Sequence, residues 1–389
     1  MERTANLDLA AWRANPTPLA SRPLSLRVFT AILIACVCLS AFLASWLPLQ
    51  VSVVTVFLFA GPHNWFELRY FLMRLPVRFG KSRNFFLTAF AGIGLLTLAY
   101  VALPVLYNFG FWPDHAWPTV LASWNTLLLA WLALLVRLRS KQKLGRDWSW
   151  TIPVALGLCS LNWLAPEFFS LAIIYLHPLV ALWFLDRHLR RTRPGWLRAY
   201  RRSLCLLPLL LVGMVWQLSR TPSLADDNGL FWRITQHAGA QLLPNVSSHV
   251  LVAVHLFLEM LHYAVWLVAL PLIARPQRSE TARLRVRPSW SGTAFARIRA
   301  GRTDRSLSSA RDQGSRNLWV RVWPLKTVPL ARHPRGFPKL VATALGLGVF
   351  LVVVLWFGFS VDYATTRDVY FTVAIAHVLA EAPFLLKML

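Results

Sequence analysis

The chain has 389 residues, of which 56% are hydrophobic and only 15% are charged, and its formal net charge is +25. Soluble domains rarely have this composition, and a basic excess in an apolar chain indicates the cytoplasmic loops of a membrane protein rather than a nucleic-acid surface. We find no nucleic-acid-binding module, and the four cysteines lack the CxxC spacing of a structural zinc site.

From the N-terminus, residues 1–27 are polar and predict a cytoplasmic tail, after which apolar runs alternate with short polar segments. Each run approaches the roughly 20 residues that a helix needs to cross a bilayer, so the sequence predicts an all-α, polytopic transmembrane bundle. The ten predicted spans are roughly 28–47, 50–72, 85–107, 117–136, 148–165, 168–185, 204–219, 247–273, 340–360 and 369–386.

The basic residues predict how these spans are oriented. With the N-terminus inside, 38 of the 41 lysines and arginines fall in cytoplasmic segments or beside an inner span end. Only Arg220, Arg233 and Arg367 do not. The distribution follows the positive-inside rule, so both termini are expected in the cytoplasm, with the bacterial inner membrane as the expected location.

Between the eight spans of 28–273 and the last two spans, in 340–389, lies the basic segment 274–339. This segment is rich in Arg, Ser and Pro and poor in acids. We expect it to be largely disordered and held near anionic lipid headgroups by its charge.

Ionisable side chains inside the spans follow a recurring pattern, His-x3-Glu. It occurs as His63 with Glu67, as His255 with Glu259, and as His377 with Glu381. Residues four apart lie on one face of a helix, so each motif presents an imidazole and a carboxylate together. Buried ionisable groups are costly in lipid and mark a functional site by default.

Three further observations strengthen this pattern. His262 follows Glu259 with the Glu-x-x-His spacing of carboxylate di-iron bundles. Counted from the outer span ends, His63 lies about 13 residues deep and His255 and His377 about 8, which agrees within roughly a turn and a half. His177 lies at a comparable depth, although a lone intramembrane histidine is more often a hydrogen-bonded packing residue.

Imidazole and carboxylate groups together suit iron, zinc or manganese, and open positions beside two or three histidines suit non-haem iron. We therefore expect an intramembrane metal site, with non-haem iron as the first choice and zinc or haem as alternatives. The glutamates are expected to be ligands or to orient ligating histidines. The candidate residues are His63, His255, His262, His377, Glu259, Glu381 and Glu67, with His177 as an additional candidate.

Gly61-Pro-His-x3-Glu67 in the second span and His377-x3-Glu381 in the last resemble the motifs of the Brp/Blh family of integral-membrane β-carotene 15,15'-dioxygenases. The resemblance implies that His63 and His377, with His255 and His262 between them, hold a non-haem iron that activates O₂ to cleave a carotenoid. This chain carries Glu where the family has Asp, is longer, and lacks the family's His-Phe-Gly element.

These features favour an oxygenase acting on a lipophilic substrate, an isoprenoid or another lipid, that reaches the site through the bilayer. The alternatives are a haem-binding membrane protein, a proton-relaying transporter, and a non-enzymatic assembly protein with basic loops for acidic lipids. No catalytic residue is assigned beyond the metal site.

Other polar residues receive structural interpretations. Glu67 could instead pair with Arg69 or Arg74 near the inner interface, whereas Asn125 and Asn162 are expected to form interhelical hydrogen bonds. Four histidines are expected in loops and are given no role: His115, His188, His237 and His333.

Overall fold

The computed structural model describes residues 24–142, 147–224, 229–273, 325, 328–334 and 336–388, and in these ranges it contains helices and no strand. The helices are α1 (Leu26–Trp46), α2 (Pro48–Arg74), α3 (Arg83–Asn108), α4 (Trp117–Ser140), α5 (Thr151–Leu164), α6 (Pro166–Thr192), α7 (Leu197–Leu204), α8 (Leu206–Leu218), α9 (Gly229–His237), α10 (Ser248–Ala264), the π-helix η5 (Val265–Ala269), α11 (Leu270–Ile273), α15 (Pro329–Arg332), α16 (Pro338–Val361) and α17 (Tyr363–Met388). The predictions for residues 1–23 and for most of the basic segment 274–339 lie outside the described residues.

Eight helical segments of the described chain are long and apolar enough to cross a membrane, which indicates an integral membrane protein. Two other predicted spans are also helical. The first, α2, has 27 residues but carries several polar and charged side chains, and the second, α5, has only 14 residues. The helices therefore lie where the spans were predicted, while the count of ten crossings and the cytoplasmic termini stay predictions.

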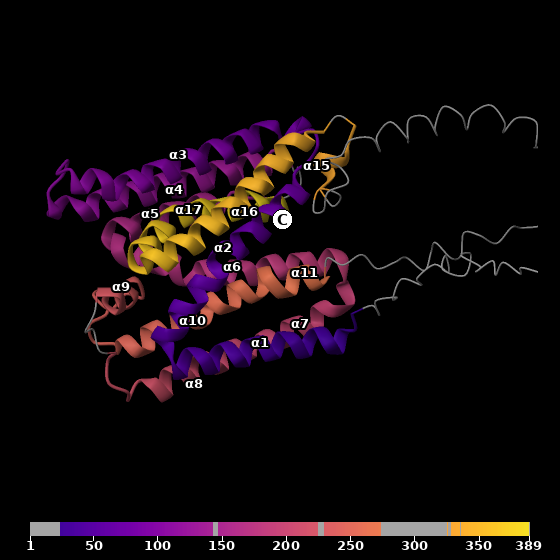
Figure 1. The fold of residues 1–389 in the computed structure, drawn as a ribbon. Coiled ribbons are helices and arrows are strands. Elements are labelled where there is room, and N and C mark those ends of the chain that lie inside the picture. Colours follow the sequence, from indigo (N-terminus) through magenta and orange to yellow (C-terminus); the bar gives the residue numbers. More distant parts are fainter. Residues whose placement is uncertain are drawn as a thin grey trace, which may run out of the picture.

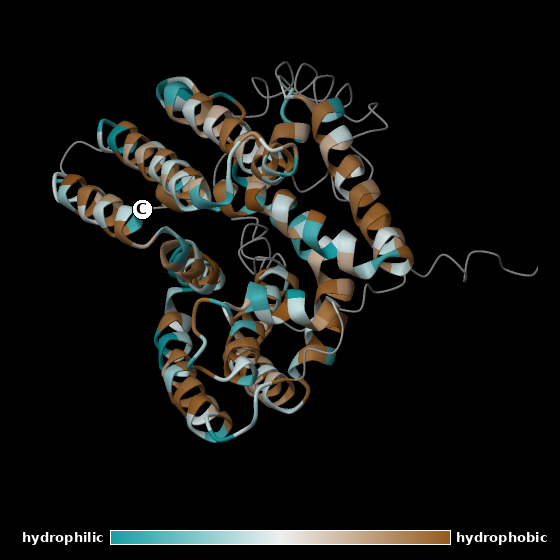
Figure 2. Ribbon diagram, turned by 90° about the vertical axis from the view of Figure 1, so that its left-hand side faces the viewer, coloured by the Kyte–Doolittle hydropathy of each residue, from teal (hydrophilic) through white to brown (hydrophobic). Residues whose placement is uncertain are grey.

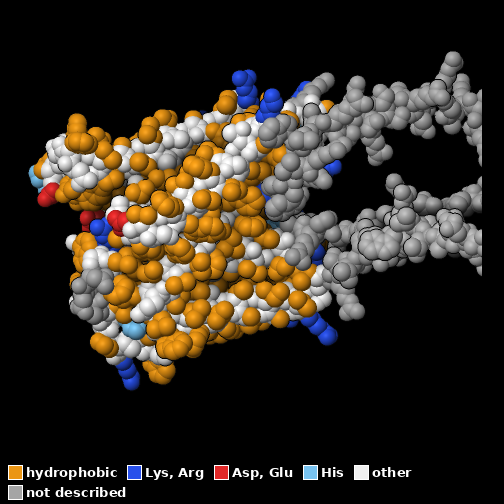
Figure 3. Space-filling view, in the orientation of Figure 1, with side chains coloured by type: hydrophobic (Ala, Val, Ile, Leu, Met, Phe, Trp, Pro, Cys, Tyr) orange, Lys and Arg blue, Asp and Glu red, His pale blue; other side chains and the backbone are white. Residues whose placement is uncertain are grey.

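The long helices run side by side, and hydrophobic residues occupy most of their length (Figures 1 and 2). Figure 3 shows hydrophobic side chains covering the flank of this bundle. On the face shown, most basic side chains lie at the end near α15 and the acidic ones lie at the opposite end. An apolar flank between two polar ends is the surface that a lipid bilayer requires.

Four helices form a ring at the centre of the bundle. Helix α10 packs against α2 and α6, and α17 closes the ring by packing against the same two helices. The outer helices cover this ring: α1 and α8 pack on α10, α16 on α2, and α3 and α4 on α17. This packing explains why the segment Ser248–Ile273, which begins with α10, is the most buried of the eight apolar segments.

Polar contacts hold the outer helices in place. As predicted, Asn125 and Asn162 link α4 to α5: Nδ2 of Asn125 donates to Oδ1 of Asn162 at 2.8 Å, and Nδ2 of Asn162 donates to the Ala122 carbonyl at 2.8 Å. The indole of Trp65 on α2 donates to the Leu345 carbonyl on α16 at 3.1 Å. Hydrogen bonds of this kind replace water where lipid supplies no partner.

The expectation that His188 lies in a loop is wrong, because α6 extends beyond the predicted span end to Thr192. His188 is buried in the last turns of this helix, and Nη2 of Arg74 donates to its Nδ1 at 2.7 Å. The apolar pattern of α6 ends before the helix does, because the last turns of this helix are polar.

Candidate metal centre

The four helices of the ring bring four histidines and two glutamates together. Two overlapping groups have ligand atoms within 4.8 Å of one another, and His262 belongs to both. The first group comprises His63, Glu67, His262 and His377, and the second His177, His262 and Glu381. Such separations approach those in a centre whose metal–ligand distances are about 2.1 Å. The cluster residues lie on four different helices, so the packing of these helices brings them together.

The imidazoles are in mutual contact. The His63 ring centroid lies 5.3 Å from that of His262 and 5.2 Å from that of His377. The His177 centroid lies 4.7 Å from that of His262 and 5.2 Å from that of His377. These short separations bring the four imidazoles together as two overlapping sets of potential ligands that share His262.

His63 shows which of its nitrogens is free to bind a metal. Its Nδ1 lies 3.0 Å from the Phe59 carbonyl oxygen one turn earlier in α2. A carbonyl can only accept, so Nδ1 carries the proton and Nε2 keeps its lone pair. This Nε2 is buried and has no hydrogen-bond partner. A backbone bond on one nitrogen that leaves the other bare is the arrangement by which metal-binding histidines are oriented.

The side chains of His262 and Glu67 also have donor atoms without hydrogen-bond partners. Neither ring nitrogen of His262 has a hydrogen-bond partner, and the same is true of both carboxylate oxygens of Glu67. Glu67 is only 1% exposed and belongs to the first group, whereas Arg74 of the alternative pairing donates to His188. Buried polar atoms without partners are expensive, and a bound cation would satisfy several at once.

His177 is a full member of the cluster. Its Nδ1 lies 3.2 Å from Oε2 of Glu381, which is only 1% exposed. Glu381 therefore stands beside a histidine of another helix rather than serving only the histidine of its own motif. This is the orienting arrangement predicted for the glutamates.

Each ring helix is irregular close to its cluster residue. Pro62 precedes His63 in α2, Pro178 follows His177 in α6, and Pro383 lies two residues after Glu381 in α17. In the fourth helix, the π-helix η5 begins three residues after His262. Interior prolines remove a backbone hydrogen bond, and π-turns widen a helix, so both loosen helical geometry where side chains must converge.

The structure does not bring His255 and Glu259 into either group. His255 contacts the rings of Tyr175 and His237, with centroids 5.6 Å and 5.1 Å away. Glu259 accepts a hydrogen bond of 2.6 Å from the Tyr263 hydroxyl. The expectation that His255 joins His262 at one metal is not met, because seven residues keep the same helix face but separate the two rings by about 10 Å.

A cavity of about 470 Å³ connects these two levels of the bundle. Its inner part is lined by the cluster histidines, and its outer part by Glu259, His255 and residues at the outer ends of α9 and α17. A second cavity of about 430 Å³ lies between α4, α5, α6 and α17, and its lining is wholly apolar. The two share Ile173, Ile375 and Val378, so apolar space adjoins the histidine cluster.

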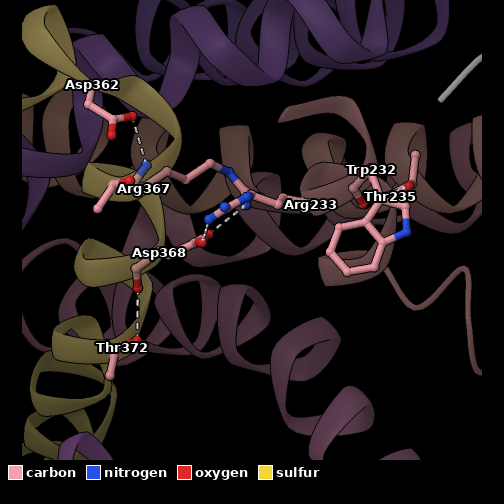
Figure 4. A network of polar contacts seen from close by, with 8 residues as sticks. Trp232, Arg233, Thr235, Asp362, Arg367, Asp368 and Thr372 are labelled. Carbon is pink, nitrogen blue, oxygen red and sulfur yellow. Dashed lines mark hydrogen bonds and ion pairs between the residues drawn. The ribbon is translucent and has the colours of Figure 1, made fainter. Parts of the chain in front are cut away.

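Figure 4 shows the outer part of the first cavity, where Arg233 of α9 reaches Asp368 of α17. His237 faces the same cavity, and it is the last residue of helix α9 rather than a loop residue as expected. Burial and the nearby Arg367 hold the pKa of His237 well below its ordinary value of 6.5. Arg233 and Arg367 had one signal in the sequence, because both are exceptions to the positive-inside pattern.

Comparison with known proteins found no relative of this chain. A scan against protein-family models found no matching family, and searches of curated proteins and of solved structures returned no match. The function is therefore inferred from the geometry of the site.

Proposed function

We propose that the chain is an integral-membrane metalloenzyme whose cluster of His63, His177, His262 and His377 holds a non-haem iron. Glu67 and Glu381 lie beside the imidazoles as a further ligand or as orienting groups. The observation that carries the proposal is a set of four imidazoles and two carboxylates, drawn from four helices, in which Nε2 of His63, both nitrogens of His262 and both oxygens of Glu67 are buried without hydrogen-bond partners. A divalent cation would offset the charge of both carboxylates in a medium that tolerates no isolated charge.

The reaction class that fits best is oxidation of a lipophilic substrate by O₂. An iron with open positions beside its histidines supplies O₂ activation when bound. Cleavage of a carbon–carbon double bond needs no other reactant, since each carbon receives one oxygen atom of O₂ and becomes a carbonyl. The wholly apolar cavity beside the cluster would hold the hydrocarbon of an isoprenoid or acyl lipid and exclude water from it.

Three alternatives use the same residues. A haem with axial histidines is disfavoured, because the cluster rings contact one another edge to face and leave no gap for a porphyrin plane. A proton-relaying transporter would need the histidines and glutamates but no metal. Zinc in place of iron would fill the same ligands and support hydrolysis rather than oxidation.

The metal content of the purified protein tests the proposal. Full-length protein, extracted in detergent without chelators, is expected to contain about one iron per chain by mass spectrometry and to melt at a lower temperature once the metal is removed. Protein that contains no iron, zinc or manganese, and whose melting is unchanged when these ions are added, would exclude a metal centre. Incorporation of both atoms of ¹⁸O₂ into the carbonyl products would then establish the reaction class.

The proposed membrane arrangement comprises ten crossings with both termini in the cytoplasm of a bacterial inner membrane. Its support is the distribution of 38 of 41 basic residues and the location of acidic side chains at one end of the bundle (Figure 3). Basic segments on the inner side would contact anionic headgroups. Single cysteines placed in the α2–α3 loop and the α9–α10 loop should react with a membrane-impermeant thiol reagent from opposite sides.

A further inference from the structure

The ion pairs at the outer end of the first cavity are uneven, because two arginines pair with a single aspartate. Arg233 forms an ion pair with Asp368, and Nη1 of Arg367 lies 3.9 Å from the same carboxylate (Figure 4). Among the described residues, no other carboxylate lies within ion-pairing distance of either guanidinium. Glu259 is the next carboxyl group of the cavity, and it is engaged by the Tyr263 hydroxyl. Asp362 acts electrostatically on Arg233, and Glu259 on Arg367, without forming an ion pair. Asp368 is therefore the one ion-pair partner that the two arginines share among the described residues.

Arg367 is the residue that makes this imbalance informative. The residue is only 3% exposed, and its Nε is buried without a hydrogen-bond partner. The guanidinium packs over the Phe371 ring at 4.7 Å, which holds it in place without neutralising it. A buried guanidinium with unused donors is costly, and a planar oxyanion is the ligand that its fork of N–H groups fits.

We infer that the outer end of the cavity, formed by Arg367, Arg233 and the face of His237, binds the anionic head of a single-chain amphiphile. The head is a carboxylate or a phosphate monoester, and the hydrocarbon chain continues inward past the histidine cluster into the apolar cavity. The inference rests on the proposed function in that it specifies the substrate, but binding of the head requires no metal.

The spacing along α17 defines how such a molecule would lie. Arg367 and His377 are ten residues apart, which places the head about 15 Å from the metal centre along the helix. An extended hydrocarbon chain covers this distance in roughly a dozen bonds. The carbon presented to the metal would therefore lie well down the chain, and the remainder would enter the apolar cavity at Ile375 and Val378.

Binding of matched ligands to the full-length protein tests the inference. The protein is placed in nanodiscs of phosphatidylcholine, and radiolabelled hexadecanoic acid, hexadecyl phosphate and hexadecan-1-ol are titrated, with empty nanodiscs subtracted. The acid or the phosphate should bind at least tenfold more tightly than the alcohol, and the stronger of the two identifies the head. Equal affinity for all three ligands would overturn the inference without any variant.

Variants assign this preference to the arginines. Arg367→Gln should abolish the preference for the charged head, whereas Arg367→Lys should retain part of it. Asp368→Asn should tighten binding of the anion several-fold, because it removes the carboxylate that competes for both arginines. Tightening cannot arise from partial unfolding, so a weaker or unchanged affinity in Asp368→Asn contradicts the inference even if Arg367→Gln folds poorly.

The metal content of the same samples separates the two proposals. Arg367→Gln should keep the metal and lose the head preference, and His377→Ala should lose the metal and keep the preference. If the wild-type protein contains no metal but still prefers the anionic ligand, the proposed oxygenase fails while the head site stands.

Discussion

His177 on α6 and Glu381 on α17 face each other across the centre of the bundle, with Nδ1 of the histidine 3.2 Å from Oε2 of the glutamate. The same ring contacts those of His262 and His377, whose centroids lie 4.7 Å and 5.2 Å away. The glutamate thus positions an imidazole of a neighbouring helix, a relationship that sequence spacing alone does not contain.

The shared position of His262 predicts that it is the least replaceable ligand. His262→Ala removes a member of both candidate groups, so we expect metal content to fall below a tenth of the wild-type value. His255→Ala is the matched control, because it removes a histidine of the same helix that lies about 10 Å away along the axis. Elemental analysis of both purified variants decides the matter, and equal loss of metal in the two would contradict the assignment.

Glu381→Gln tests the orienting role. The amide keeps the shape of the side chain but removes the charge that fixes the His177 tautomer, and such changes weaken metal binding by about 10- to 100-fold. We expect the variant to be purified with metal but to lose it to a chelator at concentrations that leave wild type loaded. Complete absence of metal in gently purified protein would instead identify Glu381 as a direct ligand.

Much of this centre is predictable from the sequence, and the remainder fails for definable reasons. His63, Glu67, His262, His377 and Glu381 follow from intramembrane His-x3-Glu spacing and matched depth, because both depend on regular helical rise. The role of His177 depends on where α6 packs, which a lone histidine does not specify.

His255 shows the limit of this reasoning, since depths that agree within a turn and a half still leave it outside both groups. A metal needs its ligands at one level of the bundle, and residues on one helix face can lie at several levels. The charged residues at the cavity mouth were visible only as exceptions to the positive-inside pattern, and their meaning required the contact between α9 and α17.

The Asn125–Asn162 contact predicts a structural effect that leaves the metal centre intact. Asn162→Ala removes the hydrogen bonds to Ala122 and Asn125 between α4 and α5, so the buried Asn125 amide keeps only its bond to Oγ of Ser170. Interhelical hydrogen bonds in membranes contribute about 1 kcal/mol each, so the free energy of unfolding should fall by roughly 1–2 kcal/mol. Thermal melting in detergent measures this loss, and metal content should match the wild type.

His237 predicts a pH dependence of stability. Its pKa in the folded protein is lowered by burial and by Arg367, whereas the unfolded chain titrates near 6.5. The stability that comes from keeping this ring neutral is complete above pH 6.5, and it is lost as the pH falls below that value because the unfolded state binds the proton first. The difference in melting temperature between wild type and His237→Gln should therefore shrink from pH 7.5 to pH 5.5. A difference in melting temperature that stays constant over this range would show that protonation of His237 does not affect stability.

The apolar cavity predicts a limit on chain length. Ala172 lines it from α6, opposite the α17 residues Val378 and Ala382, and its small side chain leaves the space open. Ala172→Phe should fill much of the roughly 430 Å³ without touching the histidine cluster. Ligands with short chains should then bind as they do to wild type, whereas binding of chains long enough to pass the metal centre should weaken by tenfold or more. The measurement is a titration of a series of acids from eight to twenty carbons in nanodiscs. Because the metal ligands lie beyond the substituted wall, metal content should be unchanged, and a uniform loss across all chain lengths would show that the hydrocarbon does not occupy this cavity.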